Sequence, residues 1–204
     1  MPLDRVLAWL PLVVLLAMLI VVRLRALAMH RRGVRVIVID WHRPAADVVC
    51  DSVLLVVAWF WIYLLAAEAL PLSLAWLPTS LSYQLVDALS VKLVGAALLL
   101  AAPLLFVAAL RSMGTSWRLG VDRRSPGPLV TDGVFAWMRN PIYVAFDLAI
   151  LATFLIHGRV VFLLLALALV LLFHCIIRRE ERFLADRFGD AFRKYCHQVA
   201  RYGL

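Results

Sequence analysis

Long apolar runs with few charges recur along this chain, and they constrain its fold more than any other feature. Five such runs lie at residues 6–22, 48–67, 86–110, 142–156 and 160–177. A helix needs about 20 mostly apolar residues to cross a bilayer, and these runs are near that length. His157, Gly158 and Arg159 separate the last two runs and predict a tight helical hairpin. With 65% hydrophobic residues, a chain of 204 residues cannot hide this surface in a soluble core. We therefore predict an all-α integral membrane bundle of about five transmembrane helices.

Basic residues are distributed unevenly between the loops that would join these helices. Arginines crowd the loops after the first and third runs and the tail after the fifth, including Arg35, Arg43, Arg118, Arg123 and Arg124. The opposite side has only Arg5, Lys92 and Arg159. Because basic loops stay in the cytoplasm, we expect the N-terminus outside and the C-terminus and residues 111–139 in the cytoplasm. This bias, together with anionic lipids, accounts for the net charge of +8 without a nucleic-acid partner.

The polar residues concentrate in the second half of the chain. Glycines and prolines between residues 111 and 139 predict an irregular backbone there, whereas residues 34–39 fit either a short strand or an interfacial segment. Residues 178–195 have helical periodicity, with Phe183, Leu184, Phe188 and Phe192 on one apolar side. We therefore predict one membrane domain, 1–204, in which residues 1–110 form helices one to three. Residues 111–204 form the polar half, which ends in a cytoplasmic helix.

A polar group stands at the start of the fourth apolar run. Asn140 and Pro141 predict a helix start, with Asn capping the free amides and Pro at the first helical position. Taken alone, Arg139 fits a side chain that reaches lipid phosphates, and Tyr143 fits the interfacial aromatic belt. Asp147 follows Tyr143 by one turn on the same helix face. A carboxylate at membrane depth is costly, so Asp147 predicts either a function or a buried partner.

These residues belong to a longer pattern with a known counterpart. Residues 127–145, GPLVTDGVFAWMRNPIYVA, resemble the cofactor-binding segment of isoprenylcysteine carboxyl methyltransferases, which ends in Arg-His-Pro-x-Tyr. That family also has a Glu-Glu-x-x-Leu motif and then Phe-Gly-x-x-Tyr/Phe, which match residues 180–184 and 188–192, and finally a tyrosine, which matches Tyr195. Several motifs in the same order make the resemblance specific over roughly the last ninety residues.

The resemblance implies a membrane methyltransferase that uses S-adenosylmethionine and acts on a lipophilic acceptor at the cytoplasmic membrane face. Residues 111–204 would then be the cofactor-binding and catalytic half. Aromatic walls can stack the adenine, a glutamate can accept hydrogen bonds from ribose or ammonium, and an arginine can face the carboxylate. We assign catalytic roles to Arg139 and Tyr143. The residues implied to bind the cofactor are Leu129, Val130, Phe135, Asn140, Pro141, Tyr143 and Glu180.

Two positions depart from the carboxyl methyltransferase pattern and bear on the acceptor. Asn140 stands where those enzymes have His, whereas phospholipid N-methyltransferases have an Asn-Pro-x-Tyr version. Ile176 stands where they have an arginine that engages the substrate, and an isoleucine cannot pair with a carboxylate. The substitutes available nearby for substrate binding are Arg178, Arg179 and His174.

Two readings from other classes remain open. NADPH-dependent membrane sterol reductases have a similar Arg-His-Pro-Asn-Tyr segment, but Ile142 replaces the Asn before Tyr143, and the Glu-pair tail fits the methyltransferases better. A non-enzymatic membrane scaffold or transporter subunit would leave the glycine-rich loop and the ordered motifs unexplained. Cys50, Cys175 and Cys196 have no metal-ligand spacing, so no metal site is expected.

Overall fold

The computed structural model describes residues 3–33, 44–70, 72–117 and 127–203. Four of its helices are long and apolar enough to cross a membrane: α1 (Leu3–Arg31), α2 (Ala45–Ala69), α4 (Leu89–Met113, extended by η1 at Gly114–Ser116) and α6 (Val160–Phe188). The shorter apolar helix α5 (Pro141–His157) has 17 residues. The remaining elements are α3 (Thr79–Ser82), η2 (Gly133–Ala136) and the C-terminal helix α7 (Asp190–Gln198). The predicted all-α membrane bundle is confirmed. Segment 34–39 and the arginines at 35, 43, 118, 123 and 124 lie outside the described residues.

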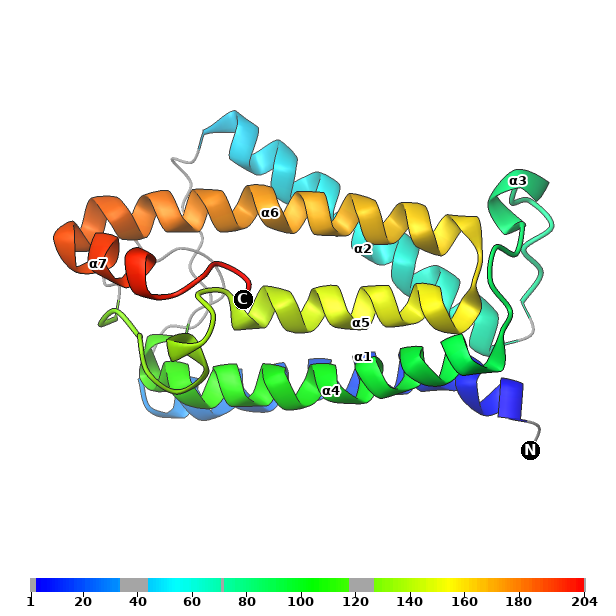
Figure 1. Ribbon diagram of the computed structural model, residues 1–204, viewed down its shortest axis with the longest axis horizontal. Helices are drawn as coiled ribbons and strands as arrows, with labels where there is room; N and C mark the ends of the chain where they lie inside the picture. Colours follow the sequence, from blue (N-terminus) through cyan, green and yellow to red (C-terminus); the bar gives the residue numbers. More distant parts are fainter. Residues whose placement is uncertain (1–2, 34–43, 71, 118–126, 204) are drawn as a thin grey trace.

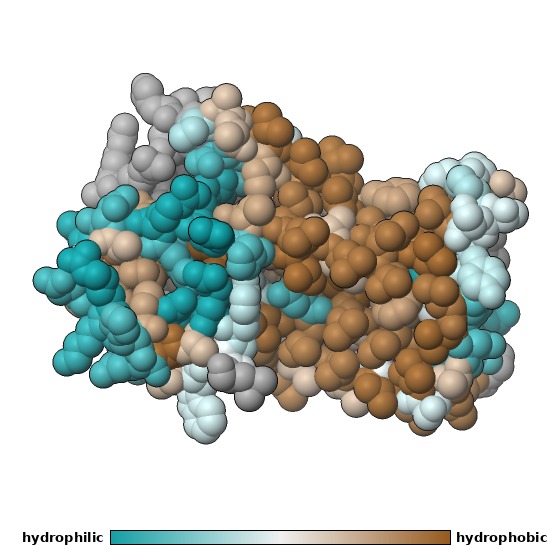
Figure 2. Space-filling model, turned by 45° about the horizontal axis from the view of Figure 1, so that its top comes forward, coloured by the Kyte–Doolittle hydropathy of each residue, from teal (hydrophilic) through white to brown (hydrophobic). Residues whose placement is uncertain are grey.

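The long helices alternate in direction, so chain segments far apart in sequence meet at one end of the bundle. There the ends of α1, α4 and α6 and the start of α5 gather beside α7 (Figure 1). Figure 2 shows a broad hydrophobic surface between this strongly hydrophilic end and a smaller hydrophilic end. Such a band is expected of a protein whose sides face lipid and whose two ends face water. The chain is therefore an integral membrane protein.

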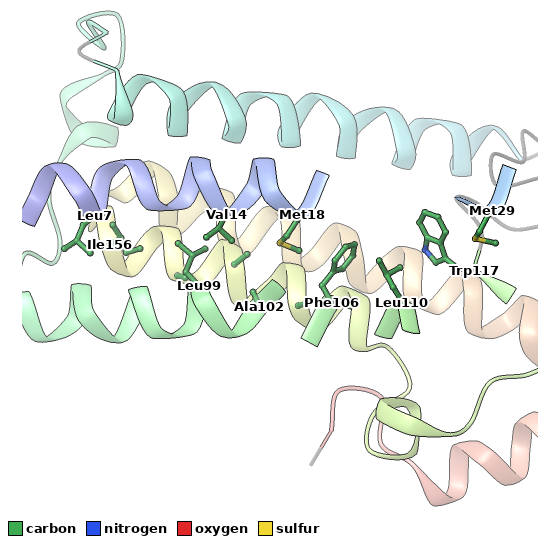
Figure 3. Close-up of a cluster of buried hydrophobic side chains, with 13 residues drawn as sticks. Leu7, Val14, Met18, Met29, Leu99, Ala102, Phe106, Leu110, Trp117 and Ile156 are labelled. Carbon is green, nitrogen blue, oxygen red and sulfur yellow. The ribbon is translucent and has the colours of Figure 1, made fainter. Parts of the chain in front are cut away.

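Two apolar clusters hold the helices together. The first lies between α1, α4 and α5 (Figure 3) and includes Met18, Leu99 and Phe106. The second joins α2 to α5 and α6 around Leu64 and Phe162. Helix α5 contributes to both clusters and so is packed between the two sides of the bundle.

Within the second cluster one polar pair is buried. The indole Nε1 of Trp61 in α2 donates to the Thr153 hydroxyl of α5 at 3.1 Å, and this hydroxyl donates to the Ile150 carbonyl at 2.7 Å. A buried donor without an acceptor is costly, so this chain of bonds allows a tryptophan to pack at the α2–α5 contact.

Close contact between α4 and α5 depends on a glycine. A Cβ atom added at Gly95 would lie 2.9 Å from Leu155 Cβ and 3.0 Å from Ile156 Cγ1. Small residues allow membrane helices to approach closely, and van der Waals packing then holds them. Gly95 therefore sets the spacing between α4 and the helix that carries the polar group at Asn140.

The predicted hairpin between the last two apolar runs is confirmed. Helix α5 ends at His157, Gly158 adopts a left-handed conformation with φ 66°, and α6 begins at Val160. The Gly158 carbonyl accepts from the Leu85 amide at 2.7 Å, and a Cβ on this glycine would collide with the Val86 carbonyl. Both the backbone conformation and the close contact require glycine here.

The predicted helix over 178–195 is wrong in its boundaries. Helix α6 continues through Glu180 to Phe188 without a break, and Gly189, with φ 54°, separates it from α7. The 29 residues of α6 span roughly 44 Å, which exceeds the roughly 30 Å of a bilayer's hydrocarbon core. The glutamate pair therefore lies on the end of a membrane helix and not on a separate surface helix.

Candidate active site

A cavity of about 380 Å³ opens at the hydrophilic end of the bundle, large enough for a small molecule. Its walls come from the end of α4, the segment 127–130, η2, the start of α5, the end of α6 and α7. The residues that line it are Met113, Ser116, Trp117, Gly127, Pro128, Leu129, Val130, Phe135, Arg139, Asn140, Ile142, Tyr143, Phe146, Glu180, Glu181, Phe183, Leu184, Phe188, Phe192 and Tyr195.

Most of the residues implied by the resemblance meet at this cavity. Those that line it are Leu129, Val130, Phe135, Arg139, Asn140, Tyr143 and Glu180. The predicted apolar side, Phe183, Leu184, Phe188 and Phe192, also faces the cavity, although it is divided between α6 and α7. Pro141 does not line it, because it is fully buried at the first position of α5.

Glycines bring the irregular segment against the helices. A Cβ at Gly127 would lie 2.5 Å from the Ser116 hydroxyl oxygen, so only glycine allows this segment to pack on η1. On the other side, the Tyr195 hydroxyl donates to the Phe135 carbonyl at 2.6 Å and ties α7 to η2. Burial raises the pKa of Tyr195 to about 12, so this phenol keeps its proton and stays a donor. These contacts fix Phe135 in the cavity wall.

The first glutamate of the pair is held by the tyrosine of the motif. The Tyr143 hydroxyl donates to Glu180 Oε1 at 2.7 Å, and the Tyr143 ring lies 5.5 Å from the Phe173 ring, centroid to centroid. A carboxylate has lone pairs on both oxygens and can accept further hydrogen bonds. Glu180 is thus a fixed acceptor facing a cavity with several aromatic residues in its wall.

The second glutamate has cationic and amide partners. Arg201 holds Glu181 Oε2 through Nη2 at 2.7 Å and through Nε at 3.0 Å. Glu181 Oε1 lies 3.2 Å from Arg139 Nε and accepts from Asn140 Nδ2, also at 3.2 Å. Adjacent acids on one helix therefore have different environments, one beside a phenol and the other between two guanidinium groups.

The Asn140 side chain does not act as predicted. Asn140 occupies the residue before α5 and Pro141 the first helical position, as expected, but no side-chain hydrogen bond caps the helix. The amide instead donates to Glu181 and, at 3.4 Å, to the Arg201 carbonyl. A charge-assisted bond to a carboxylate is stronger than a neutral cap and accounts for this choice.

Arg139 is directed into the protein. Its Nη1 donates to the Cys196 carbonyl at 3.2 Å, and its side chain is 11% exposed. The interpretation of Arg139 as a residue that reaches out to lipid phosphates is therefore wrong. It is a cation in the wall of the cavity.

The candidate substrate-binding residues lie outside the cavity. Arg179 Nη2 binds Asp51 Oδ1 at 2.8 Å and so links α6 to α2. His174 Nδ1 lies 2.6 Å from the Tyr202 hydroxyl, and Arg178 is exposed. The structure brings none of the three to the cavity wall.

Asp147 has neither of the partners considered for it. Lys92 lies 2.6 Å from Asp87, and His157 has Glu68 as its acidic neighbour at 3.9 Å. Within the described ranges, Asp147 Oδ1 is buried and accepts no hydrogen bond. It remains a costly polar atom one turn beyond the cavity residue Tyr143.

Sequence reasoning missed several residues of the site. Trp117 and Phe146 line the cavity but gave no signal beyond their hydrophobicity. Glu181 and Tyr195 were parts of recognised motifs, yet the motifs did not indicate what each side chain binds. Arg201 could not have been found, because its contact with Glu181 depends on how the chain returns after α7.

Comparisons with known proteins identify the family. The sequence profile of the phospholipid methyltransferase family matches residues 91–191. Protein-S-isoprenylcysteine O-methyltransferase of Schizosaccharomyces pombe is 40% identical over 72 residues, which are 35% of this chain and 30% of that protein. Cobalt-zinc-cadmium resistance protein CzcN of Cupriavidus metallidurans is 35% identical over 96 residues, 46% of this chain and 44% of that protein. The matches thus span less than half the length of either relative.

A solved structure extends the comparison to a larger share of the chain. The eukaryotic intramembrane Ras methyltransferase, isoprenylcysteine carboxyl methyltransferase, aligns with 81% of this chain and 53% of its own, with a TM-score of 0.52. At 22% identity this likeness shows a shared fold. The matched profile, the curated relative and the membrane fold agree, and the chain belongs to the family of integral-membrane methyltransferases that includes isoprenylcysteine and phospholipid methyltransferases.

Proposed function

We propose that this chain is an S-adenosylmethionine-dependent methyltransferase that acts on a lipophilic acceptor, in the manner of isoprenylcysteine carboxyl methyltransferases. The observation that carries the proposal is the cavity. It gathers residues of the 127–145 segment and of the glutamate pair, which are far apart in sequence, in one wall. Membership of the family supports methyl transfer and the use of this cofactor.

The side chains of the cavity fit the chemistry of the cofactor. Phe135 and the phenylalanines of α6 offer flat apolar surfaces for a base, and Glu180 offers an acceptor for ribose or ammonium donors. Arg139 and the amides at the start of α5 suit a carboxylate. When bound, S-adenosylmethionine supplies an electrophilic methyl group on its sulfonium. The residues contribute by positioning the reactants and excluding water, because an in-line displacement needs little other help.

A ligand titration tests this function against the two readings from other classes. We expect S-adenosylhomocysteine to bind the purified protein, and Glu180→Ala and Tyr143→Ala to weaken that binding. A reductase would bind NADPH instead, and a scaffold would bind neither ligand. Variants that bind S-adenosylhomocysteine as tightly as the parent would contradict the site assignment.

We also propose that the N-terminus lies outside and that the cavity opens on the cytoplasmic side. The described arginines support this orientation, since Arg31 and Arg111 lie in the last turns of α1 and α4, and Arg32 directly follows α1, at the cavity end of the bundle. A single cysteine introduced at Arg193, in a background without Cys50, Cys175 and Cys196, can be labelled in intact cells. We expect protection from an impermeant reagent, and rapid labelling from outside would overturn the orientation.

A specific observation favours a second candidate, N-methylation of a phospholipid amine. In the described part of the cavity wall the cation is Arg139, which already lies beside Glu181, and Ile176 is buried. A carboxylate acceptor would therefore lack an unpaired counter-charge among these residues. Asp147, a carboxyl group without a hydrogen bond at Oδ1, lies one turn from Tyr143 and would suit an amine.

Acceptor assays separate the two candidates. Prenylcysteine analogues and aminophospholipids would be offered to the same preparation with labelled donor. We expect only weak transfer to prenylcysteine. Efficient turnover of prenylcysteine would show that Ile176 is no obstacle and would reject the amine candidate.

A further inference from the structure

The residues after α7 form a C-terminal strap, Val199–Gly203, that crosses the start of α5 and the end of α6. The Arg139 backbone amide donates to the Ala200 carbonyl at 3.0 Å, and the Asn140 side chain donates through Nδ2 to the Arg201 carbonyl at 3.4 Å. Tyr202 bonds to His174 of α6. The strap lies beyond residues 91–191, the segment that the family profile matches. It therefore contacts residues of the cavity wall from outside the segment that the profile matches.

Arg201 grips the carboxylate of Glu181 from the outer side. Its two bonds to Oε2, at 2.7 and 3.0 Å, and a third to Oε1 at 3.2 Å fix the plane of the carboxylate. Arginine is suited to this two-pronged contact, which adds geometric definition as well as energy. The grip keeps Glu181 Oε1 directed at Arg139 and Asn140 in the cavity wall.

The carboxylate of Glu181 is shared. Two guanidinium groups, of Arg139 and Arg201, pair with it, so Glu181 does not neutralise Arg139 alone, and the other acid of the wall, Glu180, is bonded to Tyr143. The start of α5 lies beside them without a side-chain cap, so its dipole adds further positive character. Without Arg201, Glu181 would pair with Arg139 alone and would neutralise it more fully.

We propose that Arg201 is a positioning residue for the cofactor. By sharing Glu181, Arg201 keeps Arg139 from being fully neutralised, so that the Arg139 guanidinium can also attract the carboxylate of the cofactor's amino-acid group. This inference rests on the proposed function and adds a residue outside the matched segment to the same site.

Two ligands that differ only at the amino-acid end test the proposal by calorimetry. S-adenosylhomocysteine has the carboxylate, and 5′-methylthioadenosine lacks the amino-acid group. We expect Arg201→Ala to lower the affinity for S-adenosylhomocysteine about tenfold or more, the usual size of a charge-assisted contact, and to leave 5′-methylthioadenosine unchanged. Arg193→Ala is the matched control, because the ion pair described for the Arg193 side chain is an exposed one with Asp190. This variant should change neither affinity.

A second variant separates charge from loss of structure. In the double variant Arg201→Ala with Glu181→Gln, Arg139 again has no competing carboxylate, so S-adenosylhomocysteine affinity should recover. If Arg201→Ala does not fold, Arg201→Gln provides the same comparison. Equal weakening of both ligands, or no recovery in the double variant, would overturn the inference. A parent protein that binds neither ligand would reject the proposed function and the inference with it, whereas unchanged binding by the variant would reject the inference alone.

Discussion

The two ends of α5 differ in their surroundings: one is closely packed, and the other lies beside a cavity. At its C-terminal end, the helix packs against α4 through Gly95 and turns at Gly158, and its Thr153 and His157 side chains pair with Trp61 and Glu68. At its N-terminal end, Asn140 and Tyr143 contact the glutamate pair beside a cavity. Close packing gives the first end its stability. The second end retains an open space and concentrates charges, neither of which is the most stable arrangement for a helix end.

This difference implies that substitutions at the C-terminal end should change mainly the stability of the protein, and substitutions at the N-terminal end mainly its ligand binding. Buried polar networks are stabilising only when every member keeps its partners, and a cavity lowers stability by omitting contacts. Sites that combine both are expected where function requires them. Substitutions at the cavity end should therefore lower ligand binding or turnover, whereas substitutions at the packed end should lower stability.

The largest effect is expected at Glu180. Glu180→Gln keeps the size of the side chain but removes the charge that accepts from Tyr143 and from a ligand. We expect a loss of about 1.5–3 kcal/mol in S-adenosylhomocysteine binding, the range for hydrogen bonds to charged groups. Calorimetry gives the affinity, and the thermal midpoint should change little. Unchanged affinity would remove Glu180 from the site.

Arg139 and Arg178 should differ in their effect on catalysis. Arg139 lines the cavity, whereas Arg178 is exposed on α6 and does not. Arg139→Ala is expected to lower methyl transfer by about 2 kcal/mol in apparent barrier, or roughly thirtyfold, whereas Arg178→Ala should stay near parent activity. Labelled-donor assays on both variants measure this contrast. Comparable losses in the two would contradict the placement of Arg139.

The packed end should respond in stability. Gly95→Leu forces a side chain against Leu155 and Ile156 at a contact that has no space for a Cβ. Overpacking of this kind costs about 1–3 kcal/mol of unfolding free energy. Thermal unfolding in detergent should show a lower midpoint, while the folded fraction keeps its affinity for S-adenosylhomocysteine. A variant as stable as the parent would show that α4 and α5 can separate without cost.

The smallest effect concerns the buried pair between α2 and α5. Thr153→Val removes the acceptor of Trp61 Nε1 and leaves a buried donor unpaired. We expect a loss of about 1 kcal/mol in stability, with binding unaffected. The double variant Trp61→Phe with Thr153→Val removes donor and acceptor together and leaves no unpaired donor. Its unfolding midpoint should therefore differ from that of Thr153→Val alone. If the cofactor affinity also falls, the two ends of α5 are coupled.

Much of the fold could be predicted from the sequence because its determinants are local. Runs of apolar residues specify membrane helices, and His157-Gly158-Arg159 specifies a hairpin. The boundary at Gly189 was missed because helical periodicity continues on both sides of the break. The predicted sites at Leu129, Phe135 and Tyr143 came from a resemblance, and the structure brings them together.

The rest of the site depends on tertiary contacts. The Asn140 side-chain amide binds Glu181 and does not cap the helix start, because Glu181, 41 residues away in sequence, lies within hydrogen-bond distance. Arg179 binds Asp51 across 128 residues, so its absence from the cavity could not be inferred from its place beside Glu180. Propensities describe what a side chain does near its own backbone, and both of these partners are distant in sequence.

The unbroken length of α6 makes the site sensitive to helical phase. From its start at Val160, α6 carries Glu180 through the full apolar span to Tyr143. One residue added between them would rotate the glutamate by about 100° around the axis, from the cavity toward lipid or toward α2. Adding a full turn would restore the direction but displace the carboxylate by about 5.4 Å, beyond the reach of the phenol. The number of residues between Gly158 and Glu180 therefore cannot change without moving the carboxylate. The hairpin at one membrane face thus determines the direction in which Glu180 points at the other.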